Sequence, residues 1–300
     1  MSQGPVRDLI GYGGRPPRDP WPNGARIAVN FCVNYEEGGE RTIENGDDGS
    51  EDRISDVLVE RRMGRRDLNI EQSYNFGSRI GYWRLLHAFV ERDLPATINL
   101  VGQAGELVPG PLRAMIDAGW DIQCHGWRWI DHDTLEETEE RAFLARSIKQ
   151  VVELTGAPPL GNYAGLPSLN TRRLSAEMGF LYDSDCYDDE RPYWSAEFER
   201  PILVMPYSLD TNDSRFSRGQ GYETADDFAT YIRDSFDTLY AEGGTMLTIG
   251  LHARLIGRPG RIRALHEILD YIRGHDAVWI ARRGDIAQHW VGRFPPPVGC

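Results

Sequence analysis

The chain has 300 residues, of which 40% are hydrophobic and 26% are charged, and its formal net charge is −13. That length supports one large α/β domain whose core needs no disulfide bonds. The acidic balance argues against nucleic acid or an anionic membrane as the main partner, because both repel a negatively charged surface.

The start of the chain predicts neither export nor membrane insertion. Its first residues lack the apolar segment of a secretory signal, and no apolar run reaches the length of a membrane span. Cys32, Cys124, Cys186 and Cys300 lie far apart and form no pair typical of a zinc site. We therefore expect a reduced, cytoplasmic protein.

An extended arm and a buried strand are expected first. Residues 1–24 end in a Gly- and Pro-rich stretch, which indicates an arm without regular structure. Residues 25–34 are largely apolar, as in a strand buried on both faces of a parallel sheet. The polar stretch 38–70 predicts an inserted lid or an oligomer contact, because ordinary loops are much shorter.

Helical and extended patterns alternate along the rest of the chain, and residues 25–295 are taken as one catalytic domain. This alternation predicts an α/β fold with a parallel sheet, in which functional side chains gather at the carboxyl ends of the strands. Helices are expected over 77–92, 111–118, 134–154, 225–242 and 262–273, and strands over 96–101, 120–124, 202–206, 245–251 and 277–281.

Glu36 and Glu37 come directly after the first strand. Adjacent carboxylates beside a buried strand are costly unless they are paired, hydrated or functional. Crowding of acids favours the protonated form of one of them, which suits a general base. The alternative is a solvated turn with two surface acids.

His125 follows the third strand, and Trp127 and Trp129 come shortly after it. Such a loop is typical of a pocket wall, in which tryptophans stack on a planar substrate or exclude water. The alternative is an ordinary core loop with a hydrogen-bonded histidine.

His252 ends a late apolar strand, where an imidazole can act as a general acid or serve as a core residue. Arg258 lies in a Gly- and Pro-rich loop and either binds a carbonyl or carboxylate group or caps the loop. Asp210 and Asp213 follow a strand-like run. They either orient the substrate or a catalytic histidine, or form an Asx turn.

The order of these motifs resembles the polysaccharide deacetylase superfamily, and within it a subgroup of allantoinases distinct from the metal-dependent amidohydrolases. The resemblance implies a distorted (β/α)7 barrel and adds Tyr163 and Asn170 to the substrate-binding candidates. It is carried by residues 34–41 (NYEEGGER), 77–79 (GSR), 125–131 (HGWRWID), 182–185 (YDSD), 209–213 (LDTND), 250–252 (GLH) and 257–261 (GRPGR).

The deacetylase metal site is altered in this chain. In the superfamily an Asp-Asp pair supplies a base and a metal ligand, and a His-x-x-x-His motif supplies two further ligands. Here the acids are Glu36 and Glu37, and Trp129 stands four residues after His125. The allantoinase subgroup is regarded as metal-independent, so we expect no cofactor. A rebuilt zinc site of Glu37, His125 and Asp131 is the alternative.

The resemblance implies hydrolysis of a small cyclic ureide or imide. Glu36 or Glu37 would activate water, and His252 or His125 would stabilise the oxyanion or protonate the leaving nitrogen. The subgroup has Tyr-Thr-Gly-Arg where this chain has residues 163–166, ending in Leu166. Together with Ala164 and Phe76, this leucine suggests a substrate less polar than allantoin.

Two alternatives stay open on the same scaffold: a metal-dependent de-N-acetylase of an amino sugar, and a hydrolase of linear amides or esters. The arm and the insertion at 38–70 also make a homodimer or homotetramer plausible, because both segments could cover the site of a neighbouring copy.

Overall fold

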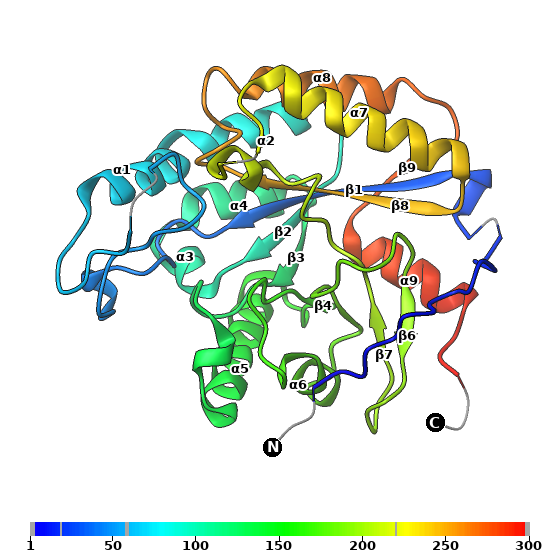
Figure 1. The fold of residues 1–300 in the computed structure, drawn as a ribbon, viewed down its shortest axis with the longest axis horizontal. Helices are drawn as coiled ribbons and strands as arrows, with labels where there is room; N and C mark the ends of the chain where they lie inside the picture. Colours follow the sequence, from blue (N-terminus) through cyan, green and yellow to red (C-terminus); the bar gives the residue numbers. More distant parts are fainter. Residues whose placement is uncertain (1–3, 19, 58–59, 220, 298–300) are drawn as a thin grey trace.

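The computed structural model describes residues 4–18, 20–57, 60–219 and 221–297. Its strands form one sheet that curls into a half-barrel, and only the β6–β7 pair is antiparallel (Figure 1). The predicted distorted α/β barrel is thereby confirmed. The order across the sheet is β6 (Tyr193–Ser195), β7 (Ile202–Val204), β5 (Tyr182–Asp183), β4 (Gly161–Asn162), β3 (Asp121–Cys124), β2 (Thr97–Leu100), β1 (Ile27–Tyr35) and β8 (Thr245–His252), and β9 (Val278–Ile280) also pairs with β1.

The first strand of the chain lies at the centre of this sheet. All nine residues of β1 are buried. Strand β8 pairs with it from Ile27 opposite Thr245 to Asn34 opposite His252. On its other edge, β9 pairs with the first part of β1 and β2 with the last. A strand enclosed in this way needs apolar side chains on both faces, which explains the continuous apolar run.

The helices pack outside the sheet, and Figure 1 shows α7 and α8 side by side along β1 and β8. Both of these helices span the residues that apolar spacing predicted, and a capping box of Thr224 and Asp227 fixes the start of α7. The helices are α1 (Leu68–Phe76), α2 (Tyr82–Val90), α3 (Gly102–Leu107), α4 (Pro109–Asp117), α5 (Glu137–Thr155), α6 (Thr171–Glu177), α7 (Ala225–Glu242), α8 (Ile262–Arg273) and α9 (Arg283–Arg293).

The helix expected over 77–92 starts instead with a π-helical turn, η3 (Gly77–Gly81). Its two glycines explain the difference. A Cβ atom on Gly77 would overlap the carboxylate of Glu37, and one on Gly81 would overlap the carbonyl of Ala253. A π-turn is a frequent device at functional sites. Here it lets the helix lie directly against the loops that follow β1 and β8.

The insertion at 38–70 lies beside the carboxyl end of β1. It contains the short 3₁₀ helix η2 (Ile43–Asn45), and an antiparallel bridge joins Gly49 to Met63. The arm runs along the β6 side of the molecule (Figure 1), where the Tyr12 hydroxyl donates to the carbonyl of Pro192. Parts of both predicted segments, residues 1–3, 19 and 58–59, and also Cys300, lie outside the described residues.

The described helices include none that combines the length and the apolar character needed to cross a lipid bilayer.

Candidate active site

A cavity of about 470 Å³ opens at the carboxyl ends of β1, β3 and β8. Glu36, His125 and His252 line it together, although they are far apart in the sequence. They meet because parallel strands end at the same edge of the sheet. The sequence placed these residues at three strand ends, and the structure brings the three side chains into one site.

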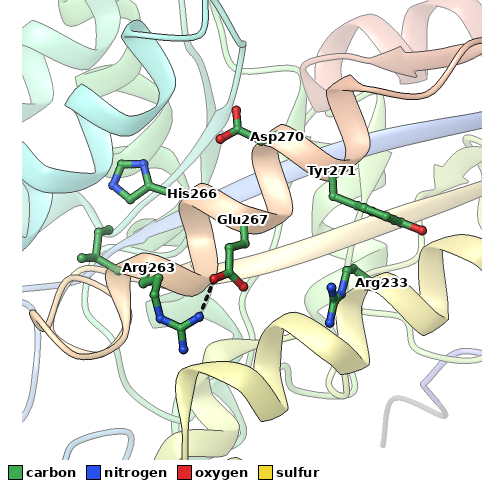
Figure 2. A pocket seen from close by; sticks show the side chains of 7 residues that line it. Arg233, Arg263, His266, Glu267, Asp270 and Tyr271 are labelled. Atoms are coloured by element: carbon green, nitrogen blue, oxygen red, sulfur yellow. Dashed lines mark hydrogen bonds and ion pairs between the residues drawn. The ribbon is translucent and has the colours of Figure 1, made fainter.

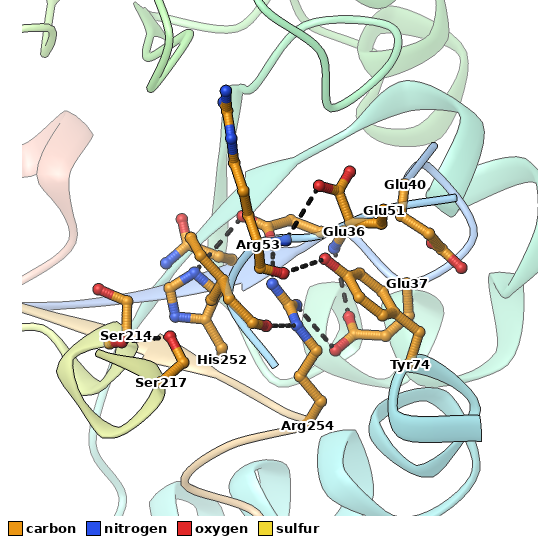
Figure 3. Close-up of polar contacts among 12 residues, drawn as sticks. Glu36, Glu37, Glu40, Glu51, Arg53, Tyr74, Ser214, Ser217, His252 and Arg254 are labelled. Carbon is orange, nitrogen blue, oxygen red and sulfur yellow. Dashed lines mark hydrogen bonds and ion pairs between the residues drawn. The ribbon is translucent and has the colours of Figure 1, made fainter. Parts of the chain in front are cut away.

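Glu36 is the central group (Figure 3). Its buried carboxylate lies 3.2 Å from His125 Nε2 and 3.5 Å from His252 Nε2, and it accepts a 2.6 Å hydrogen bond from Arg254 Nη2. Burial alone raises the pKa of this carboxyl group, but the charges of Arg254 and His252 outweigh burial and hold the pKa of Glu36 well below its ordinary value. Glu36 is therefore ionised at neutral pH.

His252 is held between two carboxylates. Its Nδ1 lies 2.6 Å from Asp213 Oδ1, and its backbone N–H donates to Asp213 Oδ2 at 2.7 Å. Asp213 is fully buried at the start of the 3₁₀ helix η5 (Asp213–Ser217). Burial lowers the pKa of His252, but Glu36 and Asp213 raise it to about 9. His252 is thus an imidazolium at neutral pH, with Nε2–H directed at the cavity.

The imidazole of His125 is fixed by two contacts with Tyr163. Nδ1 donates to the Tyr163 carbonyl at 2.6 Å, and the two rings are stacked with an interplanar angle of 4°. The Tyr163 ring in turn stacks on Tyr207 at 4.3 Å between centroids. These contacts leave Nε2 of His125 facing Glu36 and the cavity.

Glu37 lies behind the site and does not line the cavity. Its carboxylate accepts hydrogen bonds from the Tyr82 hydroxyl, from Arg254 Nη1 at 3.3 Å and from the backbone N–H of Glu36 at 3.3 Å. A catalytic role for Glu37 thus stays a prediction that its position behind the cavity does not favour. This side chain holds the loop that carries Glu36, since neighbouring residues at a strand end point to different sides.

Trp129 and Tyr163 line the cavity as predicted, and Asp131 lines it as well. Two other candidates lie elsewhere. Trp127 packs against Gly102 under the guanidinium of Arg146, whose Cζ lies 3.4 Å from the ring centroid. Asn170 stands at the start of α6 and accepts a hydrogen bond from Arg173. Neither side chain lines the cavity, and their substrate contact stays a prediction.

Asp210 and Arg258 also lie outside the cavity. Asp210 is exposed and accepts a hydrogen bond from the Tyr231 hydroxyl. Arg258 forms an ion pair with Asp56 at 3.3 Å and covers the ring of Phe76 at 3.9 Å. Substrate contact by Asp210 and Arg258 stays a prediction, and Phe76 likewise does not line the cavity. Leu166, by contrast, lines the cavity.

The donor set does not fit the metal of the deacetylases. Among the described residues there is no group of three or more His, Cys, Asp or Glu side chains that could hold a metal ion. Glu37 is engaged by Arg254, and Asp131 is paired with Arg53 at 3.1 Å. The alternative set of Glu37, His125 and Asp131 is therefore not assembled. We derive no catalytic step through a metal.

The prediction from sequence missed Arg254, whose side chain is fully buried against Glu36 and Glu37. A signal was present, because two buried acids need a buried cation and Arg254 stands two residues after His252. It also missed that Asp52, Arg53 and Ile54 line the cavity. Part of the 38–70 insertion thus forms a wall of the site.

A second hollow lies between α7 and α8 (Figure 2). Its charged side chains are paired with neighbours: Arg263 with Glu267 and Asp226, and Asp270 with Arg92. Paired charges on two exposed helix faces are typical of a solvated surface. We therefore place the chemistry in the cavity around Glu36.

Known proteins resemble this chain along nearly its whole length. Residues 67–178 match the family model described as polysaccharide deacetylase. A protein of Schizosaccharomyces pombe named for that family is 38% identical, with 97% of this chain and 98% of the relative covered. The crystal structure of a probable polysaccharide deacetylase from Pseudomonas aeruginosa PAO1 is 48% identical, and that of Puue allantoinase is 49% identical. Each has a TM-score of 0.94 and covers 97% of this chain and 99% of the other.

Proposed function

The chain belongs to the polysaccharide deacetylase family, as its motifs predicted, and on that premise we propose that it is a metal-independent hydrolase that opens the ring of a cyclic ureide or imide. The observation that carries the proposal is the row Asp213–His252–Glu36. It places an imidazolium beside an ionised carboxylate in one cavity. This is the pairing of acid and base that amide hydrolysis requires.

In the proposed reaction, water beside Glu36 attacks the ring carbonyl, and Glu36 takes its proton. His252 donates its Nε2 proton to the ring nitrogen as the C–N bond breaks, and Asp213 stabilises the imidazolium before transfer and fixes its orientation. His125 Nε2 faces the same space and is placed to stabilise the oxyanion. The products are a free carboxylate and an amide or urea nitrogen on the same opened chain.

The electrostatics of Glu36 favour an activated substrate. A carboxylate whose pKa lies well below its ordinary value is a weak base. It removes a proton efficiently only when the attacked carbonyl is reactive. A carbonyl bonded to a strained or doubly acylated ring nitrogen is reactive in this way. Such a nitrogen is a better leaving group than the nitrogen of an N-acetyl sugar. This reasoning supports ureides and imides over acetylated sugars.

The apolar part of the cavity lining supports a flat ring, and Arg53, Asp131 and Arg218 line the same cavity beside it. Trp129 and Tyr163 offer aromatic surfaces, and Leu166 offers an aliphatic one. The 49% identity with Puue allantoinase supports ring opening. Leu166, where the subgroup pattern has arginine, supports a substrate without the ureido arm of allantoin.

The test is a substrate panel on protein stripped of metal. Allantoin, hydantoin, dihydrouracil, succinimide and N-acetylglucosamine oligomers are compared, each with EDTA and with added zinc. We expect turnover of a cyclic substrate that EDTA leaves unchanged, with succinimide or hydantoin preferred over allantoin.

Two outcomes would contradict the proposal. Activity that EDTA abolishes and zinc restores would refute the metal-free reaction. Turnover confined to the acetylated sugars would refute ring opening and favour the de-N-acetylase, and turnover confined to linear amides or esters would favour the third alternative.

A further inference from the structure

We propose that the guanidinium of Arg254 is the fixed positive charge of the active site and that, by bridging Glu36 and Glu37, it closes this pair of carboxylates to a divalent cation. The inference deepens the proposed function, since it names the group that makes the site metal-independent. Its first test does not depend on turnover.

Arg254 uses every side-chain nitrogen in this role. Nη2 donates to Glu36 at 2.6 Å, Nη1 donates to Glu37 at 3.3 Å, and Nε donates to the Ile54 carbonyl at 2.6 Å. The guanidinium also lies 4.2 Å from the centroid of the Tyr74 ring (Figure 3). Only a planar group with several donors can make these contacts at once, so lysine would not be equivalent.

Charge balance explains why the cation is needed. Glu36 and Glu37 are each 1% exposed, and Glu40 and Glu51 are buried nearby. Buried carboxylates without a partner are strongly unfavourable, so they must be protonated or paired with a cation. Arg254 contacts the first two directly and is itself completely buried. A metal at these acids would have to displace a completely buried guanidinium.

Loss of Arg254 should therefore leave a vacant anionic site. The carboxylates of Glu36 and Glu37 would then lack the cation that bridges them, and carboxylate oxygens are ligands that zinc accepts. We expect zinc to bind to the variant at one equivalent and more tightly than to the wild-type protein.

The first experiment is a calorimetric zinc titration of the wild type and Arg254→Met. An affinity gain of about 10-fold or more is expected in the variant, because removal of a cation at this distance strengthens cation binding substantially. Arg258→Met is the matched control, since Arg258 lies in the same loop but touches neither acid. The double variant Arg254→Met/Glu37→Gln should lose the gain, because it removes one of the two bridged carboxylates.

The second experiment measures the acid limb of kcat/KM on the best substrate of the panel. The groups that face Glu36 are His125, His252, Arg254, Glu37 and, from α1 and α2, Tyr74 and Tyr82. In Arg254→Met this limb should move up by about 1 pH unit or more. Arg254→Lys, which keeps the charge, should move it less.

The proposal would be overturned by stoichiometric zinc binding to the wild type, by an Arg254→Met variant that is folded but binds no zinc, or by an equal gain in Arg258→Met. If Arg254→Met does not fold, the Arg254→Lys protein decides the question: an acid limb that moves up by about 1 pH unit or more although the charge is kept would refute the charge role. If no substrate of the panel is turned over, that result contradicts the proposed function but not this inference, which the zinc titration still tests.

Discussion

Asp213→Asn is the substitution that tests the assignment of the general acid most directly. Asp213 and Glu36 together raise the pKa of His252 to about 9 from its ordinary 6.5, despite burial. Asparagine keeps the size and one hydrogen bond of the aspartate but removes its charge. The imidazolium should therefore lose its proton at a lower pH.

The wild-type rate should fall as pH rises through about 9, because the acid is lost when His252 is deprotonated. In Asp213→Asn we expect this alkaline limb to move down by about 1 pH unit or more. Each pH unit corresponds to about 1.4 kcal/mol of differential stabilisation of the protonated imidazole. At neutral pH kcat should fall by about 10-fold or more, since the orientation of His252 also depends on this pair.

The same shift makes a prediction for stability. A histidine whose pKa is higher in the fold than in the unfolded chain stabilises fully below pH 6.5, and this contribution is lost as pH rises to about 9. The contribution is roughly 3 kcal/mol for the wild type and should be smaller in Asp213→Asn.

The assays are the pH dependence of kcat/KM and urea unfolding at pH 6 and pH 9. Asp210→Asn serves as the matched control, because Asp210 is exposed and lies outside the cavity. An alkaline limb that is the same in Asp213→Asn and the wild type would refute the role of His252 as the acid.

Glu36→Gln should lower kcat by about 10²-fold or more, and near wild-type turnover would contradict its role as the base. Gly77→Ala should destabilise by about 1–3 kcal/mol in urea unfolding, since the new methyl group meets Glu37, whereas Gly292→Ala, which meets no atom within 4 Å, should not. Leu166→Arg should raise kcat/KM for allantoin relative to succinimide by about 10-fold, and an unchanged ratio would exclude Leu166 as a determinant of specificity. Burial raises the pKa of Glu51 from 4.5 to about 7, so the folded state binds a proton that the unfolded chain has lost between these pH values. The free energy of unfolding should therefore fall as pH rises from 4.5 to 7. Glu51→Gln should reduce this dependence of stability on pH.

Long, strongly patterned elements could be predicted from the sequence. The apolar run of β1 and the helical spacing of α7 and α8 determine those elements locally. Strands β4 and β5 have only two residues each, too few for any periodicity, and they exist because neighbouring strands offer hydrogen bonds. Tertiary context rather than local preference decides such short strands.

The candidate site could also be predicted only in part, because local patterns identify some of its residues and tertiary context decides the others. Strand ends placed Glu36, His125 and His252 together, because parallel topology brings those ends to one edge. No pattern in an irregular loop distinguishes Trp129, which lines the cavity, from Trp127, which does not. Likewise only the fold shows that Arg254, and not Arg258, reaches the acids.

The hydrogen bond from Arg254 to the Ile54 carbonyl links the cavity wall to the cation beneath the reacting carboxylate. Residues 52–54 therefore affect both substrate binding and the position of Arg254. Replacements chosen there to admit a larger ring should also change the rate of bond cleavage. Leu166 and Leu209 line the same cavity. Efforts to broaden the substrate range should therefore start from these two leucines, where affinity can be tuned while the chemistry is left intact.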